Sequence, residues 1–412
     1  MLRLSENQYI IGHVPVTDLV KKFGSPLYVY DGNVIVDQYN KLYNSFNGIN
    51  LKLKYACKAL TNPAILSLLK KNTNAGIDTV SINEVKSALK VGFDASEIIY
   101  TPNCVDFSEV EEAIALGVHL NIDNLPYLEK IGQKYGNGYP VCIRINPHIQ
   151  AGGNSKIQVG HIGSKFGISY LQFEEIISVC EKYDLDIEGL HIHTGSDILD
   201  ADVFLMGAKV LFNAGKRFKN LRFMDFGSGF KVSYKDKQSV TDIQQVGEKM
   251  SEAFKSFCKE YGKDLEIWFE PGKFLVSESG TFLTQATLVK HSPACTFVGV
   301  NSGFNHLMRP MMYEAYHDIV NASNVSDEKQ IYNVVGYICE TDTFGADRSL
   351  STVSQGDIIA FKNAGAYGFE MSSNFNSRLK PAEVLIFNGK THLIRKRQTF
   401  EDLERDIVQV SL

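Results

Sequence analysis

Residues 51–60 read LKLKYACKAL, and this stretch defines the first strand of the predicted fold. Large apolar side chains alternate along it from Leu51 to Cys57, which is the period of a β-strand with one well-buried face. The run ends in Lys58, and Thr-Asn-Pro at 61–63 then predicts a turn into a helix. An ammonium group at the end of a buried strand requires a chemical explanation.

Seven further runs of the same kind follow, separated by amphipathic segments. The eight predicted strands centre on 51–57, Gly76–Ser81, Glu97–Tyr100, Val118–Ile122, Pro140–Asn146, Asp186–His193, Arg222–Phe226 and Leu265–Phe269. The predicted helices between them include Ser81–Leu89, Asp106–Leu116, Gln172–Tyr183, Asp202–Arg217 and Thr241–Tyr261. Eight βα units over roughly 220 residues predict a TIM (β/α)8 barrel, and the alternative is a doubly wound open sheet.

Chemically unusual residues follow several of these strands directly. Lys58 follows the first, His-Thr-Gly-Ser (193–196) the sixth, Gly-Ser-Gly (227–229) the seventh and Glu-Pro-Gly (270–272) the eighth. In a barrel these strand ends share one rim, where barrel enzymes place their chemistry. The barrel would therefore bring residues more than 200 positions apart in the sequence to face one another.

The pattern changes after about residue 275, where strands follow one another without regular helices. The predicted strands are Thr281–Lys290, Thr296–Val300, Ile331–Cys339, Asp357–Asn363, Val384–Phe387 and His392–Arg397. We expect an all-β barrel or sandwich domain over 276–412, joined by an N-terminal segment over 1–30 through the strand Leu27–Tyr30 and a second strand at Tyr9–Ile11. The barrel would then occupy 31–275.

Composition excludes several classes of function. The 412 residues carry a net charge of −5 and contain no dense basic run, which argues against nucleic-acid binding. No stretch approaches the roughly 18–20 apolar residues of a membrane helix, and residues 1–19 have no apolar signal core. Seven scattered cysteines, an odd number, fit reduced thiols in a cytoplasm.

Each residue at the predicted rim has two interpretations. Lys58 either pairs with a distant acid or, deprotonated by burial, forms a Schiff base with an aldehyde. The glycine turn 227–229 is either structural or lets backbone N–H groups approach an anion such as phosphate, with Ser196 as a further donor. Glu270 either forms a salt bridge or holds a proton on a pyridine nitrogen.

Two histidines separated by one residue lie on one face of the sixth strand. His191 and His193 could ligate a metal, as in barrel hydrolases, but the sequence offers no convincing third or fourth ligand. Alternatively, His193 stacks flat against an aromatic cofactor and His191 belongs to the core. A capturing amine, a phosphate cradle, a carboxylate and a stacking ring together match pyridoxal 5'-phosphate, so no metal is expected.

Further short motifs extend this match along nearly the whole chain. They are YACKA (55–59), RINP (144–147), SKFGI (164–168), HIHTGS (191–196), DFGSG (225–229), EPGK (270–273), NHLMRPMMY (305–313), CETD (339–342), GAYG (365–368), MSSNFNSR (371–378) and KPAEVL (380–385). In this order they resemble the barrel-type, alanine-racemase-like pyridoxal-phosphate decarboxylases, and among these most closely the enzymes that act on diaminopimelate. The resemblance implies decarboxylation of meso-2,6-diaminopimelate to L-lysine and carbon dioxide, the last step of lysine biosynthesis.

The resemblance also assigns roles. Lys58 would bind the cofactor covalently, His193 would stack on its ring and Glu270 would pair with its pyridine nitrogen. The phosphate would be bound by Ser196, Gly227, Ser228, Gly229, Gly272 and Tyr367. Lys273 stands where the family usually has Arg, and would contribute to cofactor or substrate binding.

Substrate recognition follows from the two amino-acid ends of diaminopimelate. Arg309 and Tyr313 would hold the far carboxylate, together with Tyr367, and Glu340 would hold the far ammonium. Cys339 would be the general acid. In the family this cysteine and the following glutamate reach across a dimer interface, which implies a homodimer.

Alternatives remain at this point. A related decarboxylase could act on ornithine, arginine or a carboxylated polyamine, although Arg309 and Tyr313 disfavour these substrates. A non-catalytic cofactor carrier on the same barrel would lack the second domain, and a metal-dependent hydrolase would use the two histidines. Asn301 stands where an acid is usual, and the role of Asp342 is unclear.

Overall fold

The computed structural model describes residues 1–149, 152, 160–235 and 238–412. By its internal contacts the chain forms two compact units. One contains Val36–Ser233 and Ser239–Phe274, and the other contains Met1–Ile35, Tyr234–Gln238 and Leu275–Leu412. Each unit is described separately below.

The first unit is a closed barrel of eight parallel strands. These are β5 (Asn50–Ala56), β6 (Gly76–Thr79), β7 (Ile98–Tyr100), β8 (His119–Ile122), β9 (Val141–Asn146), β11 (Ile187–His191), β12 (Phe223–Asp225) and β13 (Glu266–Phe269). Each strand pairs with the next, and closure comes from the pairing of β13 with β5. A short strand, β10 (Ile168–Ser169), adds to β9 outside the ring. The predicted TIM barrel is confirmed, and the open sheet is wrong.

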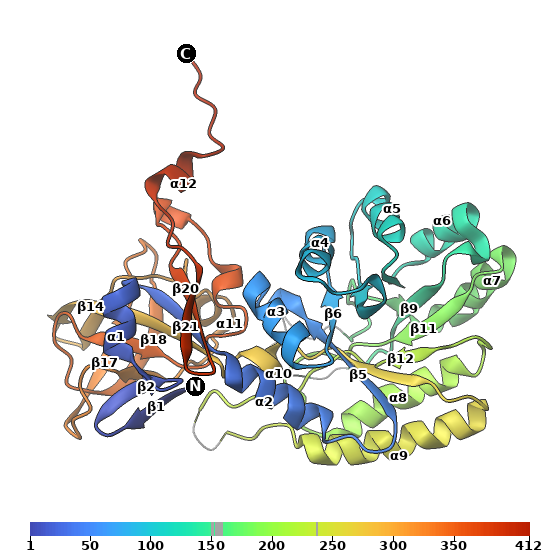
Figure 1. The fold of residues 1–412 in the computed structure, drawn as a ribbon, viewed down its shortest axis with the longest axis horizontal. Helices are drawn as coiled ribbons and strands as arrows, with labels where there is room; N and C mark the ends of the chain where they lie inside the picture. The colour runs from blue at the N-terminus through green and yellow to red at the C-terminus, as the bar shows by residue number, and fades with distance from the viewer. Residues whose placement is uncertain (150–151, 153–159, 236–237) are drawn as a thin grey trace. The chain divides into compact units, whose positions relative to one another are not determined.

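Helices alternate with these strands, as the sequence predicts (Figure 1). They are α2 (Gly32–Tyr43), α3 (Pro63–Asn72), α4 (Ile82–Val91), α5 (Phe107–Leu116), α6 (Leu125–Tyr135), α7 (Phe173–Tyr183), α8 (Ala201–Gly215), α9 (Ile243–Tyr261) and α10 (Lys273–Val276). The predicted turn after β5 caps α3, because the Asn62 side chain accepts a hydrogen bond from Ala64 N at 3.0 Å and Pro63 opens the helix.

The second unit is built on a mixed sheet in the order β18-β17-β15-β14-β4-β20-β21, in which β19 also pairs with β14 and β16 pairs with β19. The strands are β4 (Leu27–Asp31), β14 (Gly280–His291), β15 (Thr296–Val300), β16 (Ile319–Asn321), β17 (Lys329–Val335), β18 (Thr343–Ser351), β19 (Ile358–Phe361), β20 (Ala382–Phe387) and β21 (Lys390–Arg395). The N-terminal strand β4 lies between β14 and β20, which confirms that the all-β unit takes a strand from the start of the chain.

The other N-terminal strand behaves differently from the expectation. Residues 9–11 lie in β2 (Gln8–Ile11), which pairs with β1 (Leu2–Ser5) and β3 (Val14–Pro15) in a separate three-stranded sheet. This small sheet and α1 (Val16–Phe23) still pack their apolar side chains into the core of the larger sheet. Burial of this face, rather than strand pairing, therefore attaches the segment.

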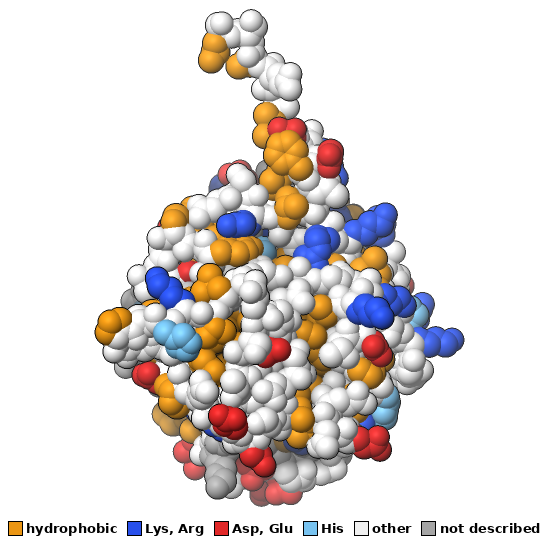
Figure 2. Space-filling view, turned by 90° about the vertical axis from the view of Figure 1, so that its left-hand side faces the viewer, with side chains coloured by type: hydrophobic (Ala, Val, Ile, Leu, Met, Phe, Trp, Pro, Cys, Tyr) orange, Lys and Arg blue, Asp and Glu red, His pale blue; other side chains and the backbone are white. Residues whose placement is uncertain are grey.

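The chain ends beyond a short helix, α12 (Phe400–Glu404), in a segment without regular structure. This segment exposes Ile407, Val408, Val410 and Leu412, and it extends upward at the top of Figures 1 and 2. No described helix of the chain is long and apolar enough to cross a membrane.

An unexpected cation lies inside the barrel. Lys54 is 4% exposed, its Nζ lies 4.1 Å from the centroid of the Trp268 ring, and it donates to Glu97 O at 3.1 Å. Trp268 in turn stacks on Phe223 with 3.5 Å between ring centroids. Burial lowers the pKa of Lys54 to about 8, and nearby carboxylates, Glu266 first, oppose this only in part.

This lowered pKa predicts a pH-dependent stability. Between about pH 8 and the unfolded-state value near pH 10.4 the unfolded chain binds the extra proton, so the free energy of unfolding rises with pH, by on the order of 3 kcal/mol from this group. Urea unfolding of wild type and Lys54→Met between pH 7.5 and 10 should show wild type gaining stability relative to the variant. Lys52→Met, at an exposed position on the same strand, should track wild type. A constant difference between wild type and Lys54→Met over this range would contradict the assignment.

Candidate active site

The carboxyl ends of the barrel strands carry a group of ionisable side chains. Lys58 follows β5, Asp78 lies in β6, His191 ends β11, Asp225 ends β12 and Glu270 directly follows β13. Since all these strands are parallel and the barrel is closed, their carboxyl ends lie on one rim. The predicted convergence of distant residues is therefore observed.

Lys58 differs from the sequence prediction in two respects. The strand ends at Ala56, and Lys58 lies in a single 3₁₀ turn, η1 (Cys57–Ala59). Its side chain is 39% exposed rather than buried, and Nζ donates to Asp78 Oδ2 at 2.7 Å. The strand register pairs Ala56 with Asp78, which explains how an acid 20 residues away reaches the amine.

Asp78 is suited to exchanging a proton with this amine. Its side chain is 1% exposed, and burial raises the pKa of Asp78, with further help from Glu270, to about 7 against the opposing effect of Lys58. A carboxyl that titrates near neutral pH beside an amine can accept or return a proton as the amine changes its bonding.

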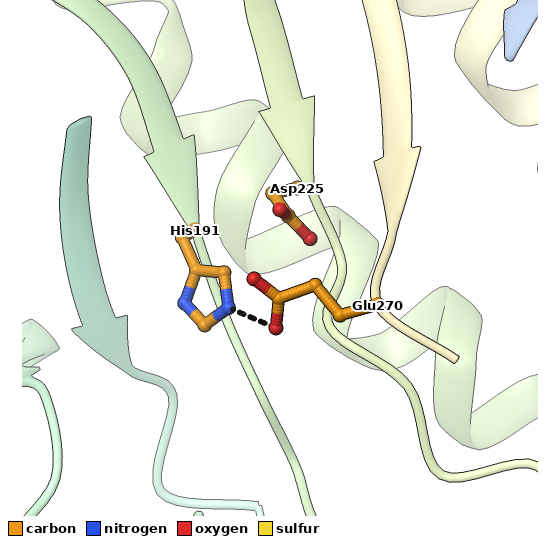
Figure 3. Close-up of side chains that lie close together, drawn as sticks. All are labelled: His191, Asp225 and Glu270. Carbon is orange, nitrogen blue, oxygen red and sulfur yellow. Dashed lines mark hydrogen bonds and ion pairs between the residues drawn. The ribbon is translucent and has the colours of Figure 1, made fainter. Parts of the chain in front are cut away.

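Three buried residues form the polar group drawn in Figure 3. His191 Nε2 donates to Glu270 Oε2 at 3.1 Å, since a ring nitrogen so close to a carboxylate must carry a proton. One side-chain ligand atom each from His191, Asp225 and Glu270 lies within 4.8 Å of the other two. His191 is in the core, as predicted, but it is bonded to a site residue.

The protonation states of this group follow from burial and charge. Burial raises the pKa of Asp225 well above its usual value, and the Glu270 charge raises it further. Burial also lowers the pKa of His191, so this ring is neutral at pH 7. Burial would raise the pKa of Glu270, but His191 and Lys58 outweigh it and hold this pKa below its usual value. Glu270 is thus the anion of the group.

His193 lies two residues beyond β11 and contacts the glycine turn. Its Nδ1 accepts from Ser228 N at 3.3 Å, so Nδ1 carries no proton. Burial first and Arg144 second lower the pKa of His193 to about 3, which leaves a neutral ring. His191 and His193 therefore make different contacts, His191 with Glu270 and His193 with the glycine turn.

The glycine turn is tied to the neighbouring strand end. Gly227 N donates to Asp225 Oδ1 at 2.8 Å, and Glu270 N donates to Gly227 O at 2.6 Å. Gly227 and Gly229 both have positive φ values, and a Cβ on either would lie 2.6 Å from a neighbouring side-chain atom. Small residues are therefore required here.

Three further predicted residues, Ser196, Gly272 and Lys273, belong to the barrel unit. Ser196 is half-buried. A Cβ on Gly272 would lie 3.2 Å from the Ala56 Cβ, so this position is also closely packed. Lys273, which replaces the usual Arg, forms an ion pair with Asp197.

The predicted substrate residues lie in the other unit. Arg309 begins α11 (Arg309–Tyr313) and is 9% exposed. Its Nη1 donates to the Tyr234 hydroxyl at 2.6 Å, and its guanidinium lies 4.7 Å from the centroid of that ring. Tyr313 is half-buried at the end of α11, and Tyr367 is half-buried with a left-handed backbone, φ +55°.

Cys339 and Glu340 lie in a turn rather than in a strand. The sequence predicted a strand to Cys339, but β17 ends at Val335. Both residues are exposed; Cys339 Sγ lies 3.5 Å from Glu340 Oε2 and accepts from Asn376 Nδ2 at 3.3 Å. The two side chains are thus presented on the surface of this unit.

Two departures from the family pattern have structural explanations. Asp342 ends the strand early, since its carboxylate accepts from Phe304 N at 2.8 Å and Ile338 N at 3.1 Å and so folds the turn. Asn301 Oδ1 accepts from Gln285 N at 2.9 Å, a contact between neighbouring strands. Both side chains therefore hold neighbouring backbone segments in place by accepting hydrogen bonds from backbone N–H groups.

Sequence reasoning missed several partners. Asp78 and Tyr234 are absent from the predicted site, and Asp225 and Arg144 enter only within the motifs DFGSG and RINP. Arg144 is buried, and its guanidinium lies 4.9 Å from the centroid of the Phe166 ring. The usable signal for Asp78, Arg144 and Asp225 is a charged residue within a buried strand, because an ionisable group there rarely lacks a partner.

Comparisons with known proteins agree with this site. Residues 33–277 match the family model described as "Pyridoxal-dependent decarboxylase, pyridoxal binding domain". The chain belongs to the pyridoxal-dependent decarboxylases. Within that class it belongs to the diaminopimelate decarboxylase family.

Two relatives and one solved structure define that membership. The diaminopimelate decarboxylase of Methanothermobacter thermautotrophicus is 36% identical over 96% of this chain and 94% of its own. That of Campylobacter jejuni is 32% identical over 93% and 96%. The crystal structure of the Helicobacter pylori enzyme complexed with L-lysine has a TM-score of 0.86 and 33% identity, covering 94% of this chain and 98% of the other.

The cofactor of this family is pyridoxal 5'-phosphate, and the residues present fit it. Glu270 Oε1 is buried and has no hydrogen-bond partner among the described residues, which leaves an acceptor for a ring N–H. The turn 227–229 excludes side chains by its close contacts, as a phosphate cradle requires. Lys58 offers an accessible amine next to an acid that can take its proton.

This fit predicts the effect of one methyl group. A Cβ on Gly227 would lie 2.6 Å from His193 Nδ1 and 2.8 Å from Ile192 O, at φ +59°. Gly227→Ala should therefore weaken cofactor binding at least about tenfold, measured by fluorescence titration, because both the turn and the His193 ring must shift.

Gly138→Ala is the matched control, since no described atom lies within 4 Å of its added Cβ. It should bind the cofactor as wild type does. Unchanged affinity in Gly227→Ala would show that the turn does not contribute to the cofactor site.

Proposed function

We propose that this chain decarboxylates meso-2,6-diaminopimelate to L-lysine and carbon dioxide, the last step of lysine biosynthesis. The observation that carries the proposal is the rim of the barrel, where Lys58, His193, the glycine turn and Glu270 assemble in a chain that matches diaminopimelate decarboxylases almost end to end. The L-lysine bound by the Helicobacter pylori relative is the product of this reaction.

Each rim residue then has a role toward the cofactor. Lys58 would bind it covalently, His193 would contact its ring, and Glu270 would accept a hydrogen bond from its pyridine nitrogen. Six further residues bind its phosphate: Ser196, Gly227, Ser228, Gly229, Gly272 and Tyr367. When bound, pyridoxal phosphate supplies a sink for the electrons that carbon dioxide leaves behind.

The protein itself handles protons, charge and orientation. Asp78 Oδ2, 2.7 Å from Lys58 Nζ, holds the proton that the amine must lose to form its covalent bond. Glu270 stays ionised and so favours a protonated ring nitrogen, and neutral His193 can face the ring without adding charge. Cys339 delivers a proton to the former α-carbon.

Recognition of the far end of the substrate falls to the other unit. Arg309 and Tyr313 bind the far carboxylate, with Lys273 and Tyr367 as further contacts, and Glu340 binds the far ammonium. The hydrogen bond from Arg309 to Tyr234 supports this role, because it fixes a guanidinium that can then bind a carboxylate through its remaining N–H groups. Ornithine has no far carboxylate that could pair with the Arg309 guanidinium.

The protein acts as a homodimer in this proposal. Cys339 and Glu340 are exposed on a turn of their unit, which supports their serving a neighbouring subunit. All seven cysteines are free, which supports a reducing compartment such as the cytoplasm.

Product analysis tests the proposed reaction. Carbon dioxide release should be measured with the holoenzyme on diaminopimelate, ornithine, arginine and lysine, with L-lysine identified by mass. We expect release from diaminopimelate at least about 100-fold above the others, since a buried cation left without its carboxylate costs several kcal/mol. Preference for ornithine or arginine would overturn the substrate assignment, and cofactor binding without release would favour a carrier.

Complementation tests the shared site. Lys58→Ala and Cys339→Ala should each be inactive, but subunits mixed under conditions of exchange should recover about a quarter of wild-type activity. This follows because half the dimers are mixed and each has one intact site. A mixture as inactive as its components, while affinity capture through a tag on one variant shows that the dimers have exchanged, would place Cys339 in its own subunit's site.

A further inference from the structure

Two buried residues beside Glu270 have no assigned role. His191 and Asp225 end neighbouring strands and both contact or approach Glu270, as Figure 3 shows. Neither is exposed: relative exposure is 1% for His191 and 0% for Asp225. A histidine and a second carboxyl at this depth need partners, and Glu270 is the group they share.

The hydrogen bonds define where protons sit in this group. His191 Nε2 donates to Glu270 Oε2 at 3.1 Å, while its Nδ1 is buried and has no partner among the described residues. A proton on Nδ1 would therefore lack an acceptor, so the ring carries its single proton on Nε2. Imidazole acts here as a fixed, neutral donor.

The surroundings of Asp225 favour its protonated form, whereas those of Glu270 favour its ionised form. Its Oδ1 accepts from Gly227 N at 2.8 Å, but Oδ2 is buried with no partner in the described part of the chain. Glu270 Oε1 is likewise buried without a hydrogen-bond partner among the described residues. Two carboxylates at this spacing cannot both ionise without a cation between them, and one of them must hold a proton.

We propose that His191 and Asp225 are positioning residues that keep Glu270 as the single anion of this buried group and fix its carboxyl plane. His191 does so by donating through Nε2, and Asp225 by carrying the proton that the pair shares. The inference rests on the proposed function, in which Glu270 meets the pyridine nitrogen of the cofactor.

The surrounding charges favour the same assignment. The hydrogen bond from His191 and the charge of Lys58 both favour ionised Glu270. Around Asp225 the leading charges are Glu270 and Asp78, both acidic, which favour its neutral form. Arg144 faces His191 and His193 and disfavours a positive charge on either ring.

The test compares pairs of variants in the holoenzyme. His191→Gln can keep a donor near the Nε2 position, whereas His191→Leu removes it. Asp225→Asn reproduces a neutral acid, because its Oδ1 can accept from Gly227 N while Nδ2 donates to Glu270, whereas Asp225→Ala removes both. Cofactor affinity by fluorescence and the acid limb of the bound cofactor's absorption spectrum are measured, with thermal unfolding as the folding check.

We expect His191→Gln and Asp225→Asn to bind the cofactor within about threefold of wild type. His191→Leu and Asp225→Ala should lose at least about tenfold in affinity, and in His191→Leu the acid limb should move up by about one pH unit because the anion loses its donor. A merely structural role would not move that limb.

Two results would overturn the inference: wild-type affinity and acid limb in His191→Leu, or an Asp225→Asn protein as impaired as Asp225→Ala. If one variant fails to fold, the other pair decides the same question.

Glu270→Gln distinguishes a failure of the proposed function from a failure of this inference alone. If Glu270→Gln binds the cofactor with full affinity and an unchanged spectrum, Glu270 does not belong to the cofactor site and part of the proposed function fails. If Glu270→Gln loses cofactor affinity but His191→Leu does not, only the inference about His191 and Asp225 is rejected.

Discussion

A charged group taken out of water must be neutralised or paired, and this requirement organises the rim of the barrel. Asp78, Asp225 and Glu270 are buried there within reach of Lys58 and Arg144. The three acids differ in state: Asp78 is paired with Lys58, Asp225 is protonated, and Glu270 is an anion that accepts a hydrogen bond from neutral His191. Three carboxyls of one chemistry thereby acquire three different states.

Barrel closure makes this arrangement possible. The residues come from separate strands, and only the pairing of β13 with β5 returns the end of the unit to its beginning. Backbone contacts then set the spacing between neighbouring ends, as where Glu270 N donates to Gly227 O and Ala56 N donates to Pro271 O. The site is therefore positioned by strand register, which is rigid, more than by its loops.

Much of this could be read from the sequence, because local patterns carry it. Alternation from Leu51 to Cys57 and its repeats gave the strands, and the glycines at 227–229 gave the turn. The partners could not be read in the same way. Asp78 reaches Lys58 through a register that pairs Ala56 with Asp78, and the Asp342 carboxylate ends β17 through contacts with Phe304 and Ile338. Such contacts depend on three-dimensional pairing, which no local period encodes.

In the proposed function the partly exposed amine of Lys58 carries the cofactor at this rim. The most direct measurement is borohydride reduction of the purified holoenzyme followed by peptide mapping by mass spectrometry. We predict one reduced pyridoxyl group per chain, on the peptide that contains Lys58. Label on another lysine, such as Lys54 or Lys273, or no stable label at all, would contradict it.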